Sequence, residues 1–346
     1  MINVGLEVSS TLTDNPTGVQ RYMDGVISGL MYENGVSLRR LFKLSRFRKR
    51  HLMPSLSVPH RWYGVSPVEW RDGIDVIHCL DTTVPARSGG RPIVVTIHDL
   101  YLALHADYLD LKTVRKKRKK VSDACRKASH IVVPTNAIKR ELTEAFDVKK
   151  PISAIPHGVR PDFSDRSLEN REERRYILGF SGGVRKNFTL LAEAFYKSRA
   201  YELGWHLTIV GRPSEEELSR VLGFLPTERL NIREQLDDED LMDLYGNAGV
   251  VSYVSHYEGF GFPVIEGMSA SVPVVTGQHG ATAEVAGGHA YLVDTHSSDS
   301  IKTGLDHAVF MGSDDVDKAK KHATSYTWKH VGQELKGVYD SVMYSG

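Results

Sequence analysis

Short apolar runs alternate with helically spaced apolar positions along the first half of the chain. The runs at residues 2–8, 76–79, 93–97, 131–134 and 151–156 predict strands. After a polar loop at residues 13–18, apolar side chains recur every three or four positions from Val19 to Leu30, and residues 136–146 also predict a helix. Buried strands separated by helices predict a parallel sheet with helices on both faces.

The same alternation restarts after a polar stretch at residues 161–175, which we interpret as a linker. We expect strands at residues 176–181, 207–210, 230–232, 250–254, 272–276 and 289–293, and helices at residues 187–196 and 238–246. The second half is therefore predicted to be another α/β unit. The tail at residues 326–343 carries an apolar stripe, which predicts an amphipathic helix able to pack on another surface, such as the first domain.

Composition narrows the class of protein. A length of 346 residues favours about two domains. With 41% hydrophobic and 25% charged residues, the chain is not disordered, collagen-like or a coiled coil. Cys79 and Cys125 provide no disulfide framework and no C-x-x-C zinc site, which predicts a reducing cytoplasm. No apolar run approaches the roughly 18 residues of a membrane span, and residues 1–8 are interpreted as a strand rather than a signal peptide.

The net charge of +1 conceals an asymmetry. Residues 1–150 hold 25 Lys and Arg against 15 Asp and Glu, whereas the remainder holds 19 against 28. Basic stretches at residues 43–50 and 112–127 account for the excess. Contact with an anionic membrane or a lipid diphosphate is one interpretation, and a solvated helix face is another. Because no nucleic-acid motif accompanies the charge, we expect no nucleic-acid partner.

A glycine-rich segment that begins at Glu258 contains the strongest candidate chemistry. Gly259 and Gly261 allow the backbone to approach an anion closely. Pro263 suits the first turn of a helix, whose N-terminus would favour a phosphate, and Glu266 lies about one turn further on. The pattern is typical of a nucleotide site, with backbone for the diphosphate and a carboxylate for the ribose. A glycine-rich turn with surface glutamates is the alternative.

Glu258 and Glu266 form an E-x7-E pattern within HYEGFGFPVIEGMSASVPVV. This pattern resembles the signature of retaining glycosyltransferases of the GT-B fold in glycosyltransferase family 4. Six further segments continue the resemblance, which is strongest at residues 176–294 and weak at residues 31–75: NPTGVQRYMDGVISGL, VVTIHDLYL, IPHGVRPDF, FSGGVRKNFTLLAEAF, LDDEDLMDLYGNAGVVSYVS and GQHGATAEVAGGHAYLVD.

The resemblance implies two Rossmann-like domains that face a cleft. Residues 1–165 would bind the acceptor, and residues 176–325 would bind a nucleotide-sugar. The helix at residues 326–346 is expected to pack back towards the first domain. Open α/β sheets place ligands at the carboxyl ends of their strands, so both sheets would contribute to the site.

The resemblance also assigns roles to the glycine-rich segment. Glu266 would hold the ribose hydroxyls of the donor, and Glu258 would hold the donor sugar. The backbone would contact sugar hydroxyls or phosphate at four consecutive residues: Gly259, Phe260, Gly261 and Phe262.

Arg185 and Lys186 match the basic pair that the family places on the donor diphosphate, where fixed cations stabilise the charge that develops on the leaving group. Arg185 directly precedes Lys186, whereas the common family form places a glycine–arginine pair several residues before the lysine. His98 would face the donor sugar, Gly18 would bring its N–H to the diphosphate or the reacting sugar, and Asp99 would anchor its loop. Without the family context, a basic pair in a loop is more often a solvated turn, and a lone His-Asp pair is more often a structural hydrogen bond.

One pattern in the chain is typical of a metal site. Asp238 and Asp240 form a D-x-D, a pattern with which other glycosyltransferases bind a divalent ion. Here it opens a predicted helix, where acidic residues suit the cap and the dipole. We therefore expect no metal and no cofactor, the nucleotide-sugar being a substrate.

These patterns predict a retaining enzyme that moves a hexose from a nucleoside diphosphate sugar to a glycan or lipid-linked acceptor. GDP-mannose is the favoured donor, with UDP- and dTDP-sugars open, and bacterial surface polysaccharide or lipopolysaccharide synthesis is the expected setting. The enzyme is expected in the cytoplasm, peripherally at the inner face of the membrane. The alternatives are a nucleotide-sugar epimerase or hydrolase of the same architecture, and a non-catalytic sugar-nucleotide-binding module.

Overall fold

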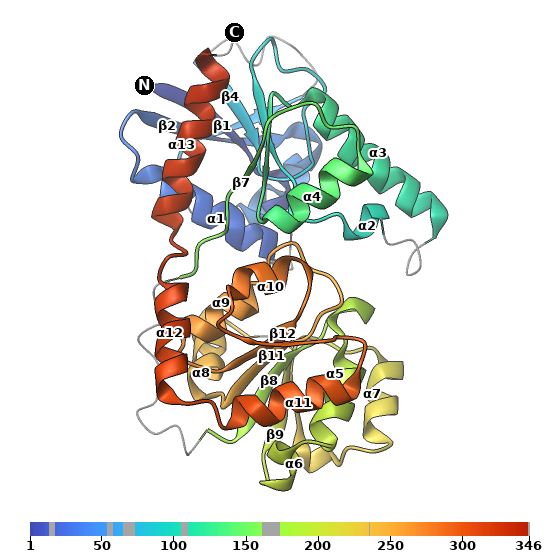
Figure 1. Cartoon of the computed structure of the whole chain (residues 1–346). Helices are drawn as coiled ribbons and strands as arrows, with labels where there is room; N and C mark the ends of the chain where they lie inside the picture. The colour runs from blue at the N-terminus through green and yellow to red at the C-terminus, as the bar shows by residue number, and fades with distance from the viewer. Residues whose placement is uncertain are drawn as a thin grey trace. The chain divides into compact units, whose positions relative to one another are not determined.

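The chain forms two compact units in a computed structural model that describes residues 1–13, 18–53, 58–64, 73–104, 110–160, 174–234 and 236–344. Unit 1 comprises Met1–Gly158 together with Thr327–Gly346, and unit 2 comprises Val159–Tyr326. Each unit is a parallel sheet with helices packed against it (Figure 1). The predicted fold class, two Rossmann-like α/β units, is confirmed.

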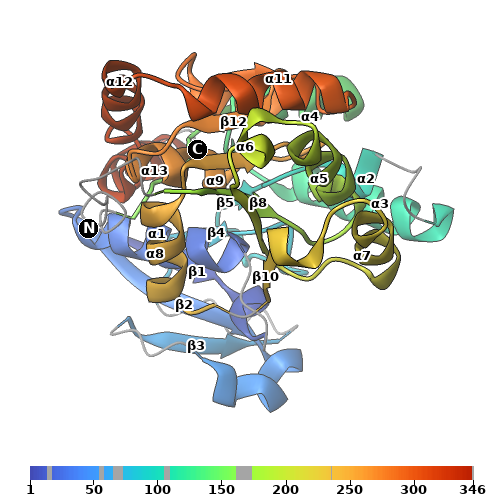
Figure 2. The ribbon, with the colours of Figure 1, turned by 90° about the horizontal axis from the view of Figure 1, so that it is seen from below.

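The sheet of unit 1 has the strand order β3-β2-β1-β4-β5-β6-β7, and all of its pairings within the described residues are parallel. Figure 2 shows β3 at one edge, beside β2. The order reverses between β1 and β4, which makes this pair the switch point of the sheet. The strands are β1 (Ile2–Glu7), β2 (Val36–Lys43), β3 (His60–Tyr63), β4 (Val76–Cys79), β5 (Ile93–Thr96), β6 (His130–Val133) and β7 (Ile152–Ala154).

The helices of unit 1 include the C-terminal one, which lies along α1 (Figure 1). The contact is close because both helices present glycine: a Cβ on Gly29 would lie 2.0 Å from the Trp328 carbonyl oxygen. Further along, the Tyr339 hydroxyl lies 2.7 Å from Nδ1 of His78 on β4. The elements are η1 (Ser9–Thr11), α1 (Gly18–Met31), η2 (Leu44–Leu52), α2 (Tyr101–Leu104), α3 (Leu111–Lys127), α4 (Asn136–Ala145) and α13 (Trp328–Tyr344).

The pattern analysis did not predict β2 and β3. Arg39 and Arg40 interrupt the apolar alternation of β2, so the hydrophobic pattern of this segment does not predict a buried strand. Arg40 is nevertheless buried, and its Nε donates to the Val58 carbonyl over 3.1 Å. Hydropathy alone predicts that an arginine is exposed. Arg40 can be buried because its guanidinium is hydrogen-bonded and its methylene groups are apolar.

The sheet of unit 2 has the order β10-β9-β8-β11-β12-β13 and is parallel throughout the described residues. The order reverses between β8 and β11, so the loops that follow these two strands emerge side by side. The strands are β8 (Tyr176–Phe180), β9 (His206–Val210), β10 (Leu230–Arg233), β11 (Val250–Tyr253), β12 (Val274–Gly277) and β13 (Tyr291–Val293).

Helices of unit 2 pack on the sheet and on one another, with α11 against α5 and α12 against α9. They are η7 (Val184–Lys186), α5 (Phe188–Tyr196), α6 (Arg199–Glu202), α7 (Glu215–Leu222), η8 (Thr227–Arg229), α8 (Asp238–Asn247), α9 (Phe262–Ser269), α10 (Gly280–Ala286), α11 (Ser298–Val309) and α12 (Ser313–Ala323). The sequence patterns did not predict five of these helices: α6, α7, α10, α11 and α12.

Two strands begin later than predicted. β12 begins at Val274 rather than at residue 272, because Pro273 has no N–H to give to the ladder. β13 begins at Tyr291 rather than at residue 289, because the His289 amide donates to the Ala286 carbonyl at the end of α10.

The predicted linker at residues 161–175 falls largely outside the described residues, as do residues 14–17 of the predicted loop at 13–18. No helix in the described ranges combines the length and the hydropathy of a membrane span.

Candidate active site

Lys186 and Glu258 meet at the switch point of unit 2. Lys186 ends η7 after β8, and Glu258 lies in the loop after β11, 72 positions further along the chain. Nζ of Lys186 donates to Oε1 of Glu258 over 2.8 Å, and Arg185 Nη1 lies 3.9 Å from Oε2. The sequence-predicted basic pair and the first predicted glutamate therefore form one charged cluster.

The cluster keeps its glutamate ionised. The Glu258 side chain is only 9% exposed, and burial raises its pKa, but Lys186 and Arg185 lower it by more. The net pKa therefore lies below its ordinary value, and the carboxylate is charged at neutral pH. Arg185 is the more exposed of the two cations, at 28% against 19% for Lys186.

Tyr253 is a member of the cluster that the sequence analysis did not predict. It is the last residue of β11, and its hydroxyl accepts a hydrogen bond from Lys186 Nζ, which also lies 4.5 Å from the centre of the phenol ring. Burial and the Glu258 charge raise the pKa of Tyr253 well above its usual value, so the phenol stays neutral. A tyrosine in a buried strand has the sequence signature of a core residue, and no local pattern marks it as part of a site.

Asn187, in the segment after β8, forms a hydrogen bond to the loop after β11. It adopts the left-handed conformation, with a φ of 60°, between η7 and α5. Its Nδ2 donates to the carbonyls of Val254 over 3.2 Å and Thr295 over 2.7 Å. The backbone amide of His256 also donates to the Arg185 carbonyl over 2.8 Å. These bonds fix the position of Arg185 and Lys186 relative to the Glu258 loop.

The glycine-rich segment leads into α9 as predicted. Gly261 has a φ of 94°, and a Cβ there would lie 2.8 Å from Thr282 Cγ2, so both the backbone and the space require glycine. α9 begins at Phe262 with proline in its first turn, and its N-cap has no side chain to cap it. Such a helix start attracts anions. Phe260 is buried in the apolar core, so a ligand would meet its backbone rather than its ring.

Glu266 lies in α9, 4% exposed. Its Oε2 accepts a hydrogen bond from the Tyr245 hydroxyl of α8 over 2.7 Å. The carboxylate is therefore held by a neighbouring helix, which sets its direction before any ligand arrives. Tyr245 is a positioning partner that the sequence reasoning missed.

The unit 1 candidates lie after β5 and at the start of α1. His98 Nε2 donates to the Leu80 carbonyl over 2.8 Å, and the ring meets Tyr22 edge to face at 4.7 Å between centroids. Burial lowers the pKa of His98, so the imidazole is neutral at neutral pH and Nδ1 is its acceptor. Asp99 Oδ1 accepts from the Tyr101 amide over 3.1 Å, which is a loop-anchoring bond. Gly18 is the exposed first residue of α1.

The acidic D-x-D forms the first turn of α8. Asp237 caps this helix by accepting from the Asp240 amide over 2.8 Å, and Asp238 lies 2.6 Å from Arg160. Over the described ranges, no three His, Cys, Asp or Glu side chains are grouped to hold a metal ion.

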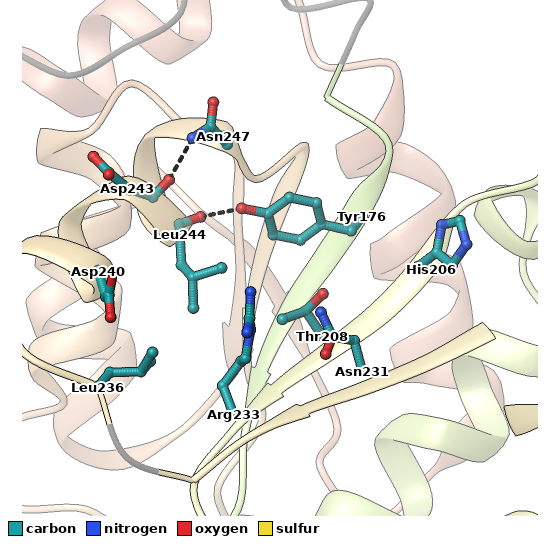
Figure 3. A pocket seen from close by; sticks show the side chains of 10 residues that line it. All are labelled: Tyr176, His206, Thr208, Asn231, Arg233, Leu236, Asp240, Asp243, Leu244 and Asn247. Carbon is teal, nitrogen blue, oxygen red and sulfur yellow. Dashed lines mark hydrogen bonds between the residues drawn. The ribbon is translucent and has the colours of Figure 1, made fainter. Parts of the chain in front are cut away.

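Hollows lie on both units. In unit 2, one of about 480 Å³ lies between α8 and the face of β8 to β10 (Figure 3). The Tyr176 hydroxyl there donates to the Leu244 carbonyl over 2.6 Å, and neither Lys186 nor Glu258 lines it. A second, of about 400 Å³, lies beside Gly183 and Arg212. In unit 1, a pocket of about 270 Å³ is lined by His98. The charged cluster of Lys186, Arg185 and Glu258 thus lies outside the hollow drawn in Figure 3.

Two parallel-sheet units with a basic–acidic cluster at the switch point of the second define a GT-B glycosyltransferase. Two family models match: "Glycosyltransferase Family 4" over residues 29–163 and "Glycosyl transferases group 1" over residues 161–325. The chain belongs to this family of glycosyltransferases.

Curated relatives agree with the family. O-antigen chain mannosyltransferase B of Escherichia coli is 26% identical over 61% of this chain and 60% of its own length. Mannosylfructose-phosphate synthase of Agrobacterium fabrum is 26% identical over 66% of this chain and 57% of its own. The chain thus spans about six-tenths of the length of the curated relatives it matches.

Solved structures share the fold. Sucrose-phosphate synthase from Thermosynechococcus elongatus superposes with a TM-score of 0.77 at 13% identity, covering 100% of both chains. Anabaena HepE, solved in complex with UDP-glucose, superposes with a TM-score of 0.74 at 13% identity over 99% of this chain and 100% of its own. At these identities the likeness establishes the fold.

Proposed function

We propose that the protein transfers a hexose from a nucleoside diphosphate sugar to a glycan or lipid-linked acceptor, with retention of anomeric configuration. The observation that carries the proposal is the cluster of Lys186, Arg185 and Glu258 after β8 and β11. α9 begins four residues beyond Glu258, and its N-terminus adds a second feature that favours an anion.

The leaving diphosphate requires nearby cations that stabilise its charge. Negative charge develops on the leaving oxygen as the glycosidic bond breaks, and Lys186 and Arg185 stabilise it because they are already fixed in place. Glu258 binds donor-sugar hydroxyls, and Glu266 binds the ribose. The neutral His98 accepts a hydroxyl hydrogen from the sugar at Nδ1.

Retention follows from attack on the face that the diphosphate leaves. The acceptor hydroxyl forms the new bond to the anomeric carbon as the old bond breaks, and its proton passes to the departing phosphate oxygen. No covalent enzyme intermediate is involved. Because the cations neutralise the leaving group, we propose that the reaction needs neither a metal nor a cofactor.

GDP-mannose is the proposed donor and a bacterial surface polysaccharide the proposed product. Support comes from relatives named as mannosyltransferases, among them one that uses GDP-mannose on a cellobiosyl-diphosphopolyprenol. The exposed basic face of α3 suits an anionic lipid surface, so we place the protein in the cytoplasm at the inner face of the membrane.

The test is a proton NMR time course with GDP-mannose, EDTA and two kinds of mannoside acceptor, one neutral and one that carries a phosphate group. The proposal predicts a new α-anomeric signal that forms only with acceptor and is unaffected by EDTA. Donor loss without acceptor would indicate a hydrolase or epimerase instead. Donor binding without turnover under every acceptor would indicate a non-catalytic binding module.

A further inference from the structure

The pocket beside His98 in unit 1 is built on the switch point of that sheet. Its walls come from the segments after β1, β4 and β5 and from α1, α2 and α3. In open parallel sheets, ligands bind beyond the carboxyl ends of the strands at the switch point. Its volume of about 270 Å³ is a compact space on the scale of a single sugar ring rather than a long glycan.

One wall of the pocket offers groups that suit sugar hydroxyls. Gln20 of α1 lines it, and among the described residues no partner is found for its buried Oε1. His98 lines it too, with Nδ1 as the acceptor because Nε2 donates to Leu80. An enclosed amide oxygen without a partner is costly unless a ligand hydroxyl satisfies it.

α3 gives the pocket a cationic side. Lys117 and Lys120 of α3 both line the pocket, and they lie three positions apart, on the same side of the helix. Lys120 Nζ donates to the Thr83 hydroxyl over 3.0 Å, which holds the ammonium group at the pocket. Both lysines belong to a run of six consecutive cations, Arg115 to Lys120, whose mutual repulsion an anion would relieve.

The two carboxylates of the pocket have backbone partners in their own loops. Asp81 accepts from the amide of Thr83, and Asp99 accepts from the amide of Tyr101. One oxygen of each carboxylate is thus held by its own loop. Leu102 of α2, 38% exposed, adds an apolar surface at the same pocket.

We propose that this pocket binds the acceptor and that Lys117 and Lys120 make it specific for an acceptor sugar that carries a phosphate group. The acceptor sugar lies against Gln20, and its phosphate lies against the two lysines. The inference rests on the proposed transferase function and adds the chemical class of the acceptor. A soluble sugar phosphate and a lipid-linked sugar diphosphate share this chemistry.

The test is a calorimetric titration of the full chain, without donor, with mannose 1-phosphate and with methyl mannoside. We expect mannose 1-phosphate to bind at least about tenfold more tightly, since each charge-assisted hydrogen bond contributes about one order of magnitude. Lys117→Ala with Lys120→Ala should remove this preference. Lys116→Ala with Lys119→Ala is the matched control, because these lysines lie on the same helix outside the pocket and should preserve it.

A third variant excludes the donor site. Mannose 1-phosphate should bind Lys186→Ala as tightly as wild type; loss of binding there would place the phosphate in unit 2 and overturn the inference. Equal affinity for mannose 1-phosphate and methyl mannoside, or equal effects of the two lysine pairs, would also overturn the inference.

A prenyl-diphosphate mannoside distinguishes a lipid-linked acceptor from a soluble one. If it binds more tightly than mannose 1-phosphate and Leu102→Ala weakens its binding, the acceptor is lipid-linked. If the two ligands bind equally, the acceptor is soluble.

The two proposals fail differently. If only this inference is wrong, wild type will still transfer mannose to neutral acceptors, and the Lys117→Ala, Lys120→Ala variant will match it on every acceptor. If the transferase function is wrong, no acceptor will yield a product.

Discussion

Lys186 is the residue on which the proposed chemistry depends most. Its ammonium group is shared between Glu258 and the Tyr253 hydroxyl, so it is already in place when a diphosphate arrives. A pre-positioned cation stabilises a developing charge without further reorganisation, which is why its removal is costly.

Lys186→Ala should lower kcat by about 10²–10³-fold, since a fixed group that stabilises transition-state charge contributes on this order. Steady-state kinetics and a circular dichroism spectrum make the measurement. Lys302→Ala is the control, because Lys302 forms an i,i+4 pair with Asp306 on α11, outside the cluster. Near-wild-type kcat in Lys186→Ala would rule out the diphosphate role.

Glu7, the last residue of β1, is the second residue with a measurable signature. Burial, and then the Asp81 charge, raise its pKa to about 7, against smaller opposing effects of Ser9, Lys43 and Tyr63. Its Oε1 accepts from Tyr63 over 3.0 Å, whereas its Oε2 has no partner among the described residues.

The raised pKa predicts how stability changes with pH. The native state keeps the Glu7 proton between about pH 4.5 and 7 while the unfolded state loses it, so the carboxyl's contribution to the unfolding free energy falls by up to about 3 kcal/mol as pH rises. The difference between wild type and Glu7→Gln in urea unfolding should shift in favour of the variant over this range. Glu144→Gln, on the exposed side of α4, controls for loss of a surface charge. A pH-independent difference for Glu7→Gln would contradict the account.

At the scale of elements, α13 and α1 form the closest helix contact of unit 1. Cβ atoms at Gly29 and Gly332 would lie 2.0 Å and 2.4 Å from backbone oxygens of the facing helix. Backbone cannot move aside as a flexible side chain does, so each alanine would push the helices apart.

Gly29→Ala and Gly332→Ala should each destabilise unit 1 by about 2 kcal/mol or more. Gly337→Ala, in the same helix with open space at its Cβ, should be neutral or slightly stabilising because alanine favours helix. Differential scanning calorimetry should resolve a lowered transition only for the first two. An equal response of all three variants would show that helix propensity, not the close contact, decides.

The sequence predicts elements where one local pattern dominates. The glycines, the proline and the glutamate around Gly261 identify a helix start and a site, because each type has a local physical reason to be there. The same reasoning fails for β2, where buried Arg40 breaks the apolar period. It also fails for Tyr253 and Tyr245, whose roles follow from which strands and helices are neighbours rather than from their local sequence.

At the scale of the whole molecule, charge is divided unevenly along the chain. Residues 1–150 carry the basic excess, and the first half of α3 concentrates much of it in exposed side chains from Arg115 to Lys120. Such a helix binds anionic surfaces through summed weak attractions that salt screens.

Replacement of Arg115, Lys116, Arg118 and Lys119 by Gln should release the protein from anionic vesicles, with binding lost in proportion to the charge removed. Co-sedimentation at low and high salt makes the measurement, with neutral vesicles as the lipid control. Replacement of Lys318, Lys320 and Lys321 on α12, three cations against four, provides a charge-removal control in unit 2. Unchanged sedimentation of the α3 variant would show that the membrane contact lies elsewhere.

The central claim is that unit 2 holds a nucleoside diphosphate at Lys186 and Glu266, and ligand-induced thermal stabilisation tests it most directly. The melting temperature would be recorded with UDP, GDP, ADP, dTDP and CMP, each with and without EDTA, for wild type and Glu266→Ala. The account predicts a clear rise with GDP that EDTA does not change and that Glu266→Ala reduces. No rise with any nucleotide, or a rise that EDTA abolishes, would contradict it.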